Sequence, residues 1–199
     1  MPTESVPPPG PSPAQLEIHL EPLPYEGRLE TRHAGQIDLV VIHCTELPDL
    51  AMARKYGEQV LYPDSGTGNS GHFYIDRDGS AHRYVDTTRV ANHTRGYNPR
   101  SIGIELVNTG RYPHWLDSGH QAMTETYPAA QIDTLIELLR QLAARYPSLR
   151  WVAGHEDLDT TLVASSNDPD VRVARKRDPG PEFPWDRVMA AIPLQRLRP

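Results

Sequence analysis

Ile37-Asp38-Leu39-Val40-Val41-Ile42-His43 is a short, almost continuous apolar run that ends in a histidine. Apolar residues at nearly every position are typical of a strand that is covered on both faces. We therefore expect residues 37–43 to form a central strand, with His43 at its carboxyl end. Since neighbouring side chains of a strand point to opposite faces, Cys44 is expected in the core if His43 faces a site.

A second strand is predicted over residues 101–107, where apolar side chains alternate with small or polar ones. Glu105 shares its face with Gly103, and most of the surrounding residues are apolar or small. It is either a surface glutamate on an edge strand or a carboxylate that lines a pocket. Partial burial in a pocket would raise the pKa of this carboxyl group and suit it to act as a general base.

Strands and helices alternate along the rest of the chain. Apolar residues recur at three- and four-residue steps from 128 to 146, which predicts an amphipathic helix. Further elements are expected as a hairpin of residues 72–76 and 81–85 around Asp78-Gly79, mixed helical character over 49–61, a strand over 151–154 and a closing helix over 185–192. Together they predict an α/β fold, a single domain with a central mixed β-sheet flanked by α-helices.

Composition excludes several functional classes. The formal net charge is −6 and no block is rich in lysine or arginine, which argues against a nucleic-acid partner. No apolar run approaches the ~20 residues that span a membrane. The single cysteine, Cys44, excludes an internal disulfide framework and a cysteine-rich metal site. We expect a monomer.

Two polar segments carry the residues with the clearest chemistry. His43 and His155 each end a predicted strand, where loops form clefts, and Lys176-Arg177-Asp178-Pro179-Gly180-Pro181 follows. Two imidazoles and a carboxylate can fill three positions around Zn²⁺ and leave the fourth open for water. The positively charged ammonium group of Lys176, two residues before the carboxylate, would lie over the same site. Taken singly, each histidine is better explained as a structural residue, and Asp178 as a turn residue before Pro179.

Four blocks occur in a fixed order and resemble the signature blocks of the zinc-dependent N-acetylmuramoyl-L-alanine amidases. They are Val41-Ile42-His43, Ser101-Ile102-Gly103-Ile104-Glu105-Leu106, Gly154-His155-Glu156-Asp157 and Arg175-Lys176-Arg177-Asp178-Pro179-Gly180-Pro181. Within this family the chain is similar to the AmpD-like branch of the fold shared with peptidoglycan recognition proteins. Gly71-His72-Phe73, Asp78-Gly79 and Ala91-Asn92-His93 also match, and the resemblance extends from about residue 37 to residue 188.

The resemblance implies a ligand set, a base and a reaction. It implies Zn²⁺ ligands at His43, His155 and Asp178, a catalytic glutamate at Glu105, and at Lys176 the lysine that stabilises the tetrahedral intermediate. The implied reaction is hydrolysis of the amide between the lactyl group of N-acetylmuramic acid and L-alanine, in peptidoglycan or muropeptides. The alternatives are a peptidoglycan-binding module without catalysis and a zinc peptidase acting on the stem peptide.

Substrate contacts are expected from residues 92–95. His93 either hydrogen-bonds the sugar or peptide or is an ordinary loop histidine, and Asn92 and Arg95 are plausible contacts whose spacing fixes no role. His72 is expected either to pack in the protein interior or to support a metal ligand as one of its outer partners.

Two regions depart from the family pattern. Lys176 follows His155 by 21 residues, and the polar insertion over residues 156–175 could be a lid, an extension of the cleft or inert surface. The segment 107–119 carries Tyr112, His114 and Trp115, which could stack on sugar rings or cover the edge of the core.

Prolines gather at the beginning of the chain, at positions 2, 7, 8, 9, 11 and 13. Such a segment resembles an extended tether, so we divide the chain into a proline-rich tether over residues 1–15 and an amidase domain over residues 16–199. The given chain shows no signal peptide or anchor. We expect the cell envelope or periplasm, because a cytoplasmic recycling enzyme, the alternative, has no obvious need for a proline-rich arm.

Overall fold

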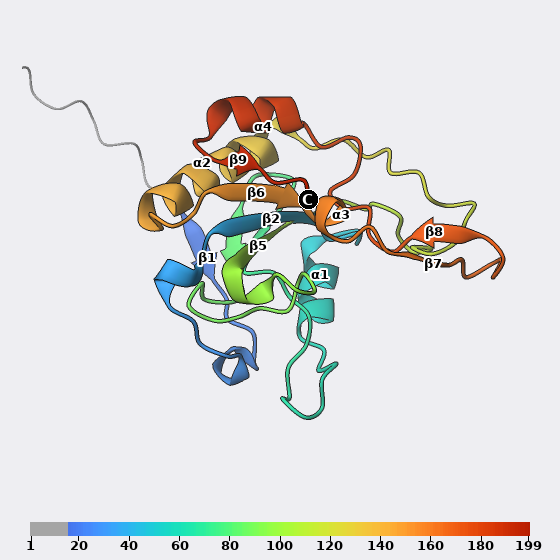
Figure 1. The fold of residues 1–199 in the computed structure, drawn as a ribbon, viewed down its shortest axis with the longest axis horizontal. Helices are drawn as coiled ribbons and strands as arrows, with labels where there is room; N and C mark the ends of the chain where they lie inside the picture. Colours follow the sequence, from blue (N-terminus) through green and yellow to red (C-terminus); the bar gives the residue numbers. More distant parts are fainter. Residues whose placement is uncertain (1–15) are drawn as a thin grey trace, which may run out of the picture.

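The computed structural model describes residues 16–199, so the predicted tether over residues 1–15 lies outside the described residues. A seven-stranded sheet forms the centre of the described part, in the order β1-β4-β3-β5-β2-β6-β9 (Figure 1). The β3–β4 pair is antiparallel and the other neighbouring pairs are parallel. These strands are β1 (Ile18–Leu20), β2 (Leu39–Cys44), β3 (Phe73–Ile75), β4 (Ala81–Arg83), β5 (Ser101–Leu106), β6 (Trp151–Gly154) and β9 (Gln195–Arg196). The predicted mixed sheet flanked by helices is confirmed.

Helices cover the sheet on both faces. The helices α2 (Ala129–Arg145) and α4 (Trp185–Ala191) lie on one face, and α1 (Leu50–Gly57) lies on the other (Figure 1). The described chain also has the short helix α3 (His155–Leu158) and 3₁₀ turns at Glu26–Arg28, Ala34–Gln36 and Asn98–Arg100. Among the described residues no helix is long and apolar enough to cross a membrane.

The main core lies between α2 and the sheet, and it confirms the helical periodicity read over residues 128–146. The apolar stripe of α2 is buried against side chains that β2 and β5 send to the same face. Burying an aliphatic side chain contributes roughly 1.5–3 kcal/mol, so this stripe fixes α2 on the sheet. The contacting residues are Ile132, Leu135, Ile136, Leu139 and Leu142 on α2, and Val40, Ile42, Ile102, Ile104 and Leu106 on the strands.

The strand register determines which residues meet at the edge of the sheet. In the parallel β2–β5 pair His43 is the partner of Glu105, and in the β2–β6 pair Ile42 is the partner of Gly154. His155 directly follows Gly154, so it reaches the same edge as His43. The carboxyl ends of neighbouring parallel strands are where α/β folds bind ligands.

The expected hairpin is present, and its glycine is required. The Asp78-Gly79 turn joins β3 to β4, and Gly79 adopts φ +91°, a left-handed conformation that favours glycine. A Cβ at this position would also lie 2.9 Å from the carbonyl oxygen of Ala130, at the beginning of α2. The turn therefore packs directly against the helix.

The insertion over residues 156–175 stands apart from the central sheet. It contributes a two-stranded antiparallel ribbon, β7 (Leu162–Ala164) and β8 (Arg172–Ala174), that extends away from the body (Figure 1). Its tip is bonded to the segment after β5: the Ser166 amide donates to the carbonyl of Leu116 at 2.9 Å, and the Ser165 hydroxyl donates to the same carbonyl at 2.7 Å. The two regions that depart from the family pattern thus lie together.

Predicted element bounds are close to the observed ones, with one shift at the first strand. The run expected as a strand from Ile37 begins at Leu39, because Ala34–Gln36 form a 3₁₀ turn and the Ile37 amide bonds the carbonyl of Ala34. The short edge strands β1 and β9 and the ribbon β7–β8 were not predicted. Runs of two or three residues carry too little periodicity to be recognised.

Candidate metal centre

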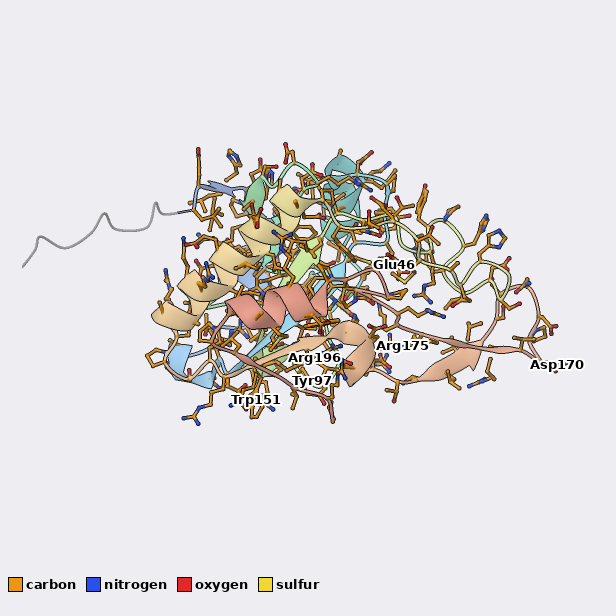
Figure 2. All side chains as sticks on the ribbon, turned by 90° about the horizontal axis from the view of Figure 1, so that it is seen from above. Glu46, Tyr97, Trp151, Asp170, Arg175 and Arg196 are labelled. Carbon is orange, nitrogen blue, oxygen red and sulfur yellow. The ribbon has the colours of Figure 1, made fainter. Side chains whose placement is uncertain are left out.

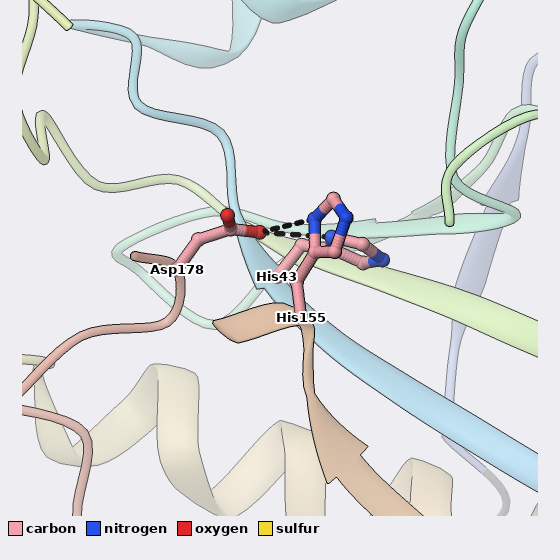
Figure 3. Close-up of side chains that lie close together, drawn as sticks. All are labelled: His43, His155 and Asp178. Carbon is pink, nitrogen blue, oxygen red and sulfur yellow. Dashed lines mark hydrogen bonds and ion pairs between the residues drawn. The ribbon is translucent and has the colours of Figure 1, made fainter. Parts of the chain in front are cut away.

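Three buried side chains from separate segments converge at the carboxyl edge of the sheet. His43 lies near the end of β2, His155 begins α3 directly after β6, and Asp178 lies in the loop after β8. Asp178 Oδ2 lies 2.9 Å from His43 Nδ1 and 3.0 Å from His155 Nδ1 (Figure 3). All three residues are at most 3% exposed, and one potential ligand atom from each lies within 4.8 Å of the others. This cluster could hold a metal ion.

The hydrogen bonds around His43 assign its tautomer. The Ser101 hydroxyl donates to the carbonyl of Tyr97 at 2.8 Å, so its oxygen accepts from His93 Nε2, 3.2 Å away. His93 Nδ1 is then an acceptor; it lies 3.0 Å from His43 Nε2 and 2.9 Å from the Thr94 hydroxyl. His43 Nε2 therefore carries the hydrogen, and His43 Nδ1 presents a lone pair toward Asp178.

This arrangement fits a cation. His43 Nδ1 and Asp178 Oδ2 are then both acceptors, and two acceptors 2.9 Å apart without a hydrogen between them repel unless a positive charge lies beside them. Among the described residues, Asp178 Oδ1 and His155 Nε2 are buried without a hydrogen-bond partner. Two imidazole nitrogens with one carboxylate oxygen are a ligand set that Zn²⁺ accepts.

The surroundings of His43 and Asp178 shift their pKa values toward the deprotonated form that binds metal. Burial first, and then the neighbouring His155, lower the pKa of His43 to about 4, so the imidazole is neutral at neutral pH. Burial alone would raise the pKa of the Asp178 carboxyl. The charge of His155 first, then the hydrogen bond from His155 and the charge of Lys176, instead hold it well below its usual value. Metal ligands must be deprotonated, and the shifted pKa values of His43 and Asp178 favour that form at neutral pH.

The backbone turn that carries Asp178 is fixed from two sides. The Glu156 amide of α3 donates to the Asp178 carbonyl at 2.9 Å, and the Tyr127 hydroxyl donates to the Pro179 carbonyl at 2.6 Å. Gly180, at φ +84°, completes the turn in a conformation that favours glycine. The Asp178 carboxylate is therefore held by the fold as well as by the histidines.

Glu105 and Lys176 line the same cavity as the three candidate ligands. This cavity has a volume of about 510 Å³, and both side chains are partly exposed to it. Burial first, and then the charge of Asp178, raise the pKa of Glu105 well above its usual value, while Lys176 acts in the opposite direction. Two glycines provide space here: a Cβ on Gly71 would lie 2.8 Å from Glu105 Cγ, and one on Gly103 would lie 2.7 Å from His93 Cγ.

The candidate substrate residues lie around this cavity in different settings. Asn92 and Arg95 line it, and the Asn92 amide also donates to the carbonyl of Gly68 at 3.0 Å. His93 lines it as well, but both of its ring nitrogens bond protein groups. His72 lies behind the site, where its Nδ1 accepts from the Gly103 amide at 3.0 Å. Cys44 is buried on the opposite face of β2, as predicted.

Four residues with a place in this site were not singled out from the sequence. Thr94 and Ser101 complete the hydrogen bonds around His93 and His43, and Glu46 and Arg111 form a buried ion pair on the cavity wall. The position of Glu46, shortly after the carboxyl end of a predicted strand, is the one sequence signal that points to it. For the others the partner lies far away along the chain and no local pattern exists.

Comparison with known proteins supports the resemblance read from the sequence blocks. Residues 33–181 match the family described as N-acetylmuramoyl-L-alanine amidase, Amidase_2. The 1,6-anhydro-N-acetylmuramyl-L-alanine amidase AmpD of Enterobacter cloacae is 30% identical over 127 residues, which are 59% of this chain and 54% of that protein. The chain thus spans about half the length of this relative.

Solved structures share the fold. The amidase AmiD from E. coli, in complex with the substrate anhydro-N-acetylmuramic acid-L-Ala-D-γ-Glu-L-Lys, matches with a TM-score of 0.60 at 24% identity, over 78% of this chain and 57% of that chain. The bumblebee peptidoglycan recognition protein PGRP-SA matches with a TM-score of 0.56 at 16% identity, over 78% of this chain and 92% of that chain. With the family match extending over residues 33–181, the chain belongs to the N-acetylmuramoyl-L-alanine amidase family Amidase_2.

Proposed function

We propose that this chain is a zinc-dependent amidase that cleaves the bond between the lactyl group of N-acetylmuramic acid and L-alanine, in peptidoglycan or in muropeptides. One observation carries the proposal: the buried cluster of His43, His155 and Asp178 opens onto the cavity that Glu105 and Lys176 also line. The family match supports amide hydrolysis, and the muropeptide bound to AmiD supports the substrate class.

The three ligands would hold Zn²⁺ through His43 Nδ1, one nitrogen of His155 and the carboxylate of Asp178. When bound, Zn²⁺ supplies a water whose pKa falls from 15.7 to roughly 7 and polarises the carbonyl oxygen of the substrate. His93 and Thr94 hold the ring of His43 in place through its Nε2. Such outer partners fix the orientation of a ligand before metal arrives.

Glu105 is proposed as the general base and then the general acid. Its raised pKa means that the carboxylate takes up a proton more readily than an exposed glutamate does. It would accept the proton of the attacking water and deliver it to the nitrogen of the departing L-alanine. Among the described residues that line the cavity, no other carboxylate is suited to this task, because Asp178 lies between two histidines and Glu46 is paired with Arg111.

Lys176 is proposed to stabilise the oxyanion that forms on the former lactyl carbonyl. It lines the cavity, and its charge acts on the pKa values of His43, Glu105 and Asp178. A fixed cation at the point where negative charge develops lowers the barrier, and losing one such contact typically costs ~10²–10³ in rate. Asn92 and Arg95 remain candidates for holding the substrate along the cavity wall.

A digestion of purified muropeptides and of intact sacculi tests the proposal. Mass spectrometry should show peptides with a free L-alanine amino terminus beside intact sugar. Removing the metal with a chelator should abolish the release, and Zn²⁺ should restore it. Cuts within the stem peptide would instead identify a peptidase, and binding to sacculi without products would identify a peptidoglycan-binding module.

We also propose the cell envelope as the location of the protein. The support is the proline-rich composition of residues 1–15, which suits a spacer between a domain and an attachment point. Fractionation of cells that produce the protein from its natural gene should place it in the envelope fraction. Recovery with cytosolic markers would overturn this proposal and leave the proposed activity intact.

A further inference from the structure

A buried arginine–glutamate pair lies on the wall of the cavity. Glu46 follows β2 with a left-handed backbone, φ 49°, and Arg111 lies in the segment after β5. Arg111 Nε donates to Glu46 Oε1 at 2.6 Å and Arg111 Nη2 donates to Glu46 Oε2 at 2.9 Å. The Arg111 side chain is 1% exposed and the Glu46 side chain is 9% exposed. This is a two-point fork that only a planar guanidinium can make.

Two further hydrogen bonds of Arg111 reach the end of the insertion. Nη1 donates to the carbonyl of Ala174 at 2.9 Å, and Nη2 contacts the carbonyl of Arg175 at 3.4 Å. These two carbonyls belong to the residues directly before Lys176. Figure 2 shows Glu46 and Arg175 at the root of the ribbon, far from Asp170 at its tip. One guanidinium therefore joins the end of β2, the segment after β5 and the backbone that leads into Lys176.

Stability alone does not account for such a pair. Burying two charges costs desolvation energy that the ion pair offsets only in part, so buried salt bridges are weak evidence of stabilisation. What the pair does provide is a fixed orientation of the guanidinium group, because each of its N–H groups points in a set direction toward its own acceptor. The Glu46 backbone is tied in as well, since Trp115 Nε1 donates to the Glu46 carbonyl at 3.0 Å.

We propose that Arg111, oriented by Glu46, is a positioning residue that holds Lys176 over the metal centre. The inference rests on the proposed function, in which Lys176 stabilises the oxyanion. It also gives the insertion a role: Leu116 bonds the tip of the ribbon and Arg111 bonds its root, so the segment that leads through Arg175 into the cavity is fixed at both ends. The position of Lys176 is then fixed although a long connection separates it from His155.

The key variant is Arg111→Lys, which retains the positive charge beside Glu46 but cannot bond the carboxylate and both carbonyls together. The matched control is Arg77→Lys. Arg77 forms the same kind of fork with Glu125, at 2.6 and 3.2 Å, and bonds the Pro48 carbonyl, without a hydrogen bond to Ala174 or Arg175. Both variants are compared in the unmodified protein and in a Lys176→Met background.

Arg111→Lys is expected to lower kcat about tenfold, part of the ~10²–10³-fold that loss of an oxyanion donor costs. KM and bound zinc should stay within about twofold of the unmodified protein. In the Lys176→Met background the same substitution should leave kcat unchanged, since the residue through which it acts is gone. Arg77→Lys should leave kcat unchanged in both backgrounds. An equal loss of kcat from Arg111→Lys in both backgrounds, or none in either, would overturn the inference.

Hydrogen exchange gives a readout that does not depend on activity. The Arg175 amide donates to the carbonyl of Thr161 at 2.9 Å, and in Arg111→Lys this amide should exchange faster than in Arg77→Lys. Unchanged exchange would show that Arg111 does not hold this segment, whatever the activity. If the unmodified protein cleaves no muropeptide, the proposed function fails and the catalytic part of this inference fails with it. Faster exchange in Arg111→Lys would still identify the structural clamp.

Discussion

His43 on β2 and Glu105 on β5 are direct partners in the parallel register of the two strands. Paired residues of neighbouring parallel strands point to the same face, so both side chains leave the sheet together toward the cavity. The next pair along, Cys44 and Leu106, points into the core, where the two are 4% and 0% exposed. One register thus supplies the proposed ligand and the proposed base, and it also separates the site from the apolar core.

Replacing Glu105 with glutamine should remove turnover without removing metal. The amide has nearly the same shape but cannot accept a proton, so kcat should fall at least ~10²-fold if general acid–base catalysis contributes as it usually does. Bound zinc, measured by elemental analysis, should remain at the level of the unmodified protein, because Glu105 is not among the three clustered ligands. Near-normal turnover in this variant would sink the assignment of the base.

Adding one methyl group at Gly71 should disturb Glu105. A Cβ there would lie 2.8 Å from Glu105 Cγ and 3.2 Å from the carbonyl oxygen of Gly103, so the glutamate side chain must move. We expect Gly71→Ala to lower kcat by roughly tenfold or more, since a misplacement near 1 Å can cost 10²-fold. Gly27→Ala is the matched control, because nothing lies within 4 Å of its Cβ position. Equal activity in the two variants would contradict this account of the cavity.

His93→Phe should weaken zinc binding. The substitution removes the acceptor at 3.0 Å from His43 Nε2, so that imidazole keeps only the more distant Thr94 hydroxyl, at 3.3 Å, to fix its orientation. Losing an outer partner of a metal ligand typically costs 10–100-fold in affinity, which competition with a chromophoric chelator would measure. His114→Phe, in an exposed position, serves as the control. Unaltered zinc affinity combined with a raised KM would instead support the predicted contact between His93 and substrate.

The metal-free protein should lose stability as the pH falls below about 6.5. Burial first, and the charge of Arg32 second, lower the pKa of His72 from 6.5 to about 3 in the folded state. A histidine with a depressed folded pKa contributes stability that is complete above pH 6.5 and is lost as the pH falls toward 3. Each pH unit in that window costs about 1.4 kcal/mol for each such group.

Thermal unfolding of the metal-free protein between pH 8 and pH 4 would measure this loss. His72→Asn is the comparison: it is expected to be less stable at neutral pH but to depend less on pH, because one titrating group is gone. Parallel pH profiles for the two proteins would show that His72 does not contribute to the acid sensitivity.

Local signals were sufficient for the main elements. The apolar period of residues 128–146 and the alternation over 101–107 arise from residues a few positions apart, and α2 and β5 confirm both. The order of four short blocks was sufficient for the family, since the match covers residues 33–181. The positions of His43, His155 and Asp178 in those blocks also pointed to the residues that the fold brings together.

The partners of those residues were not readable from the chain. His43 meets His93 across 50 positions and Asp178 across 135, and Glu46 meets Arg111 across 65. No repeating pattern links residues so far apart; they meet because strand order and register bring β2, β5 and β6 together at one edge of the sheet.

Residue types and local periodicity therefore predicted the elements of this protein, and the resemblance of four sequence blocks to a known family implied its candidate ligands. Only the tertiary structure revealed the tautomer of His43, the lack of room for a Cβ at Gly71 and the hydrogen bonds from Arg111 to the segment before Lys176. The reason is physical: backbone preferences act over a few residues, whereas hydrogen bonds and close packing depend on which distant segments the sheet sets side by side.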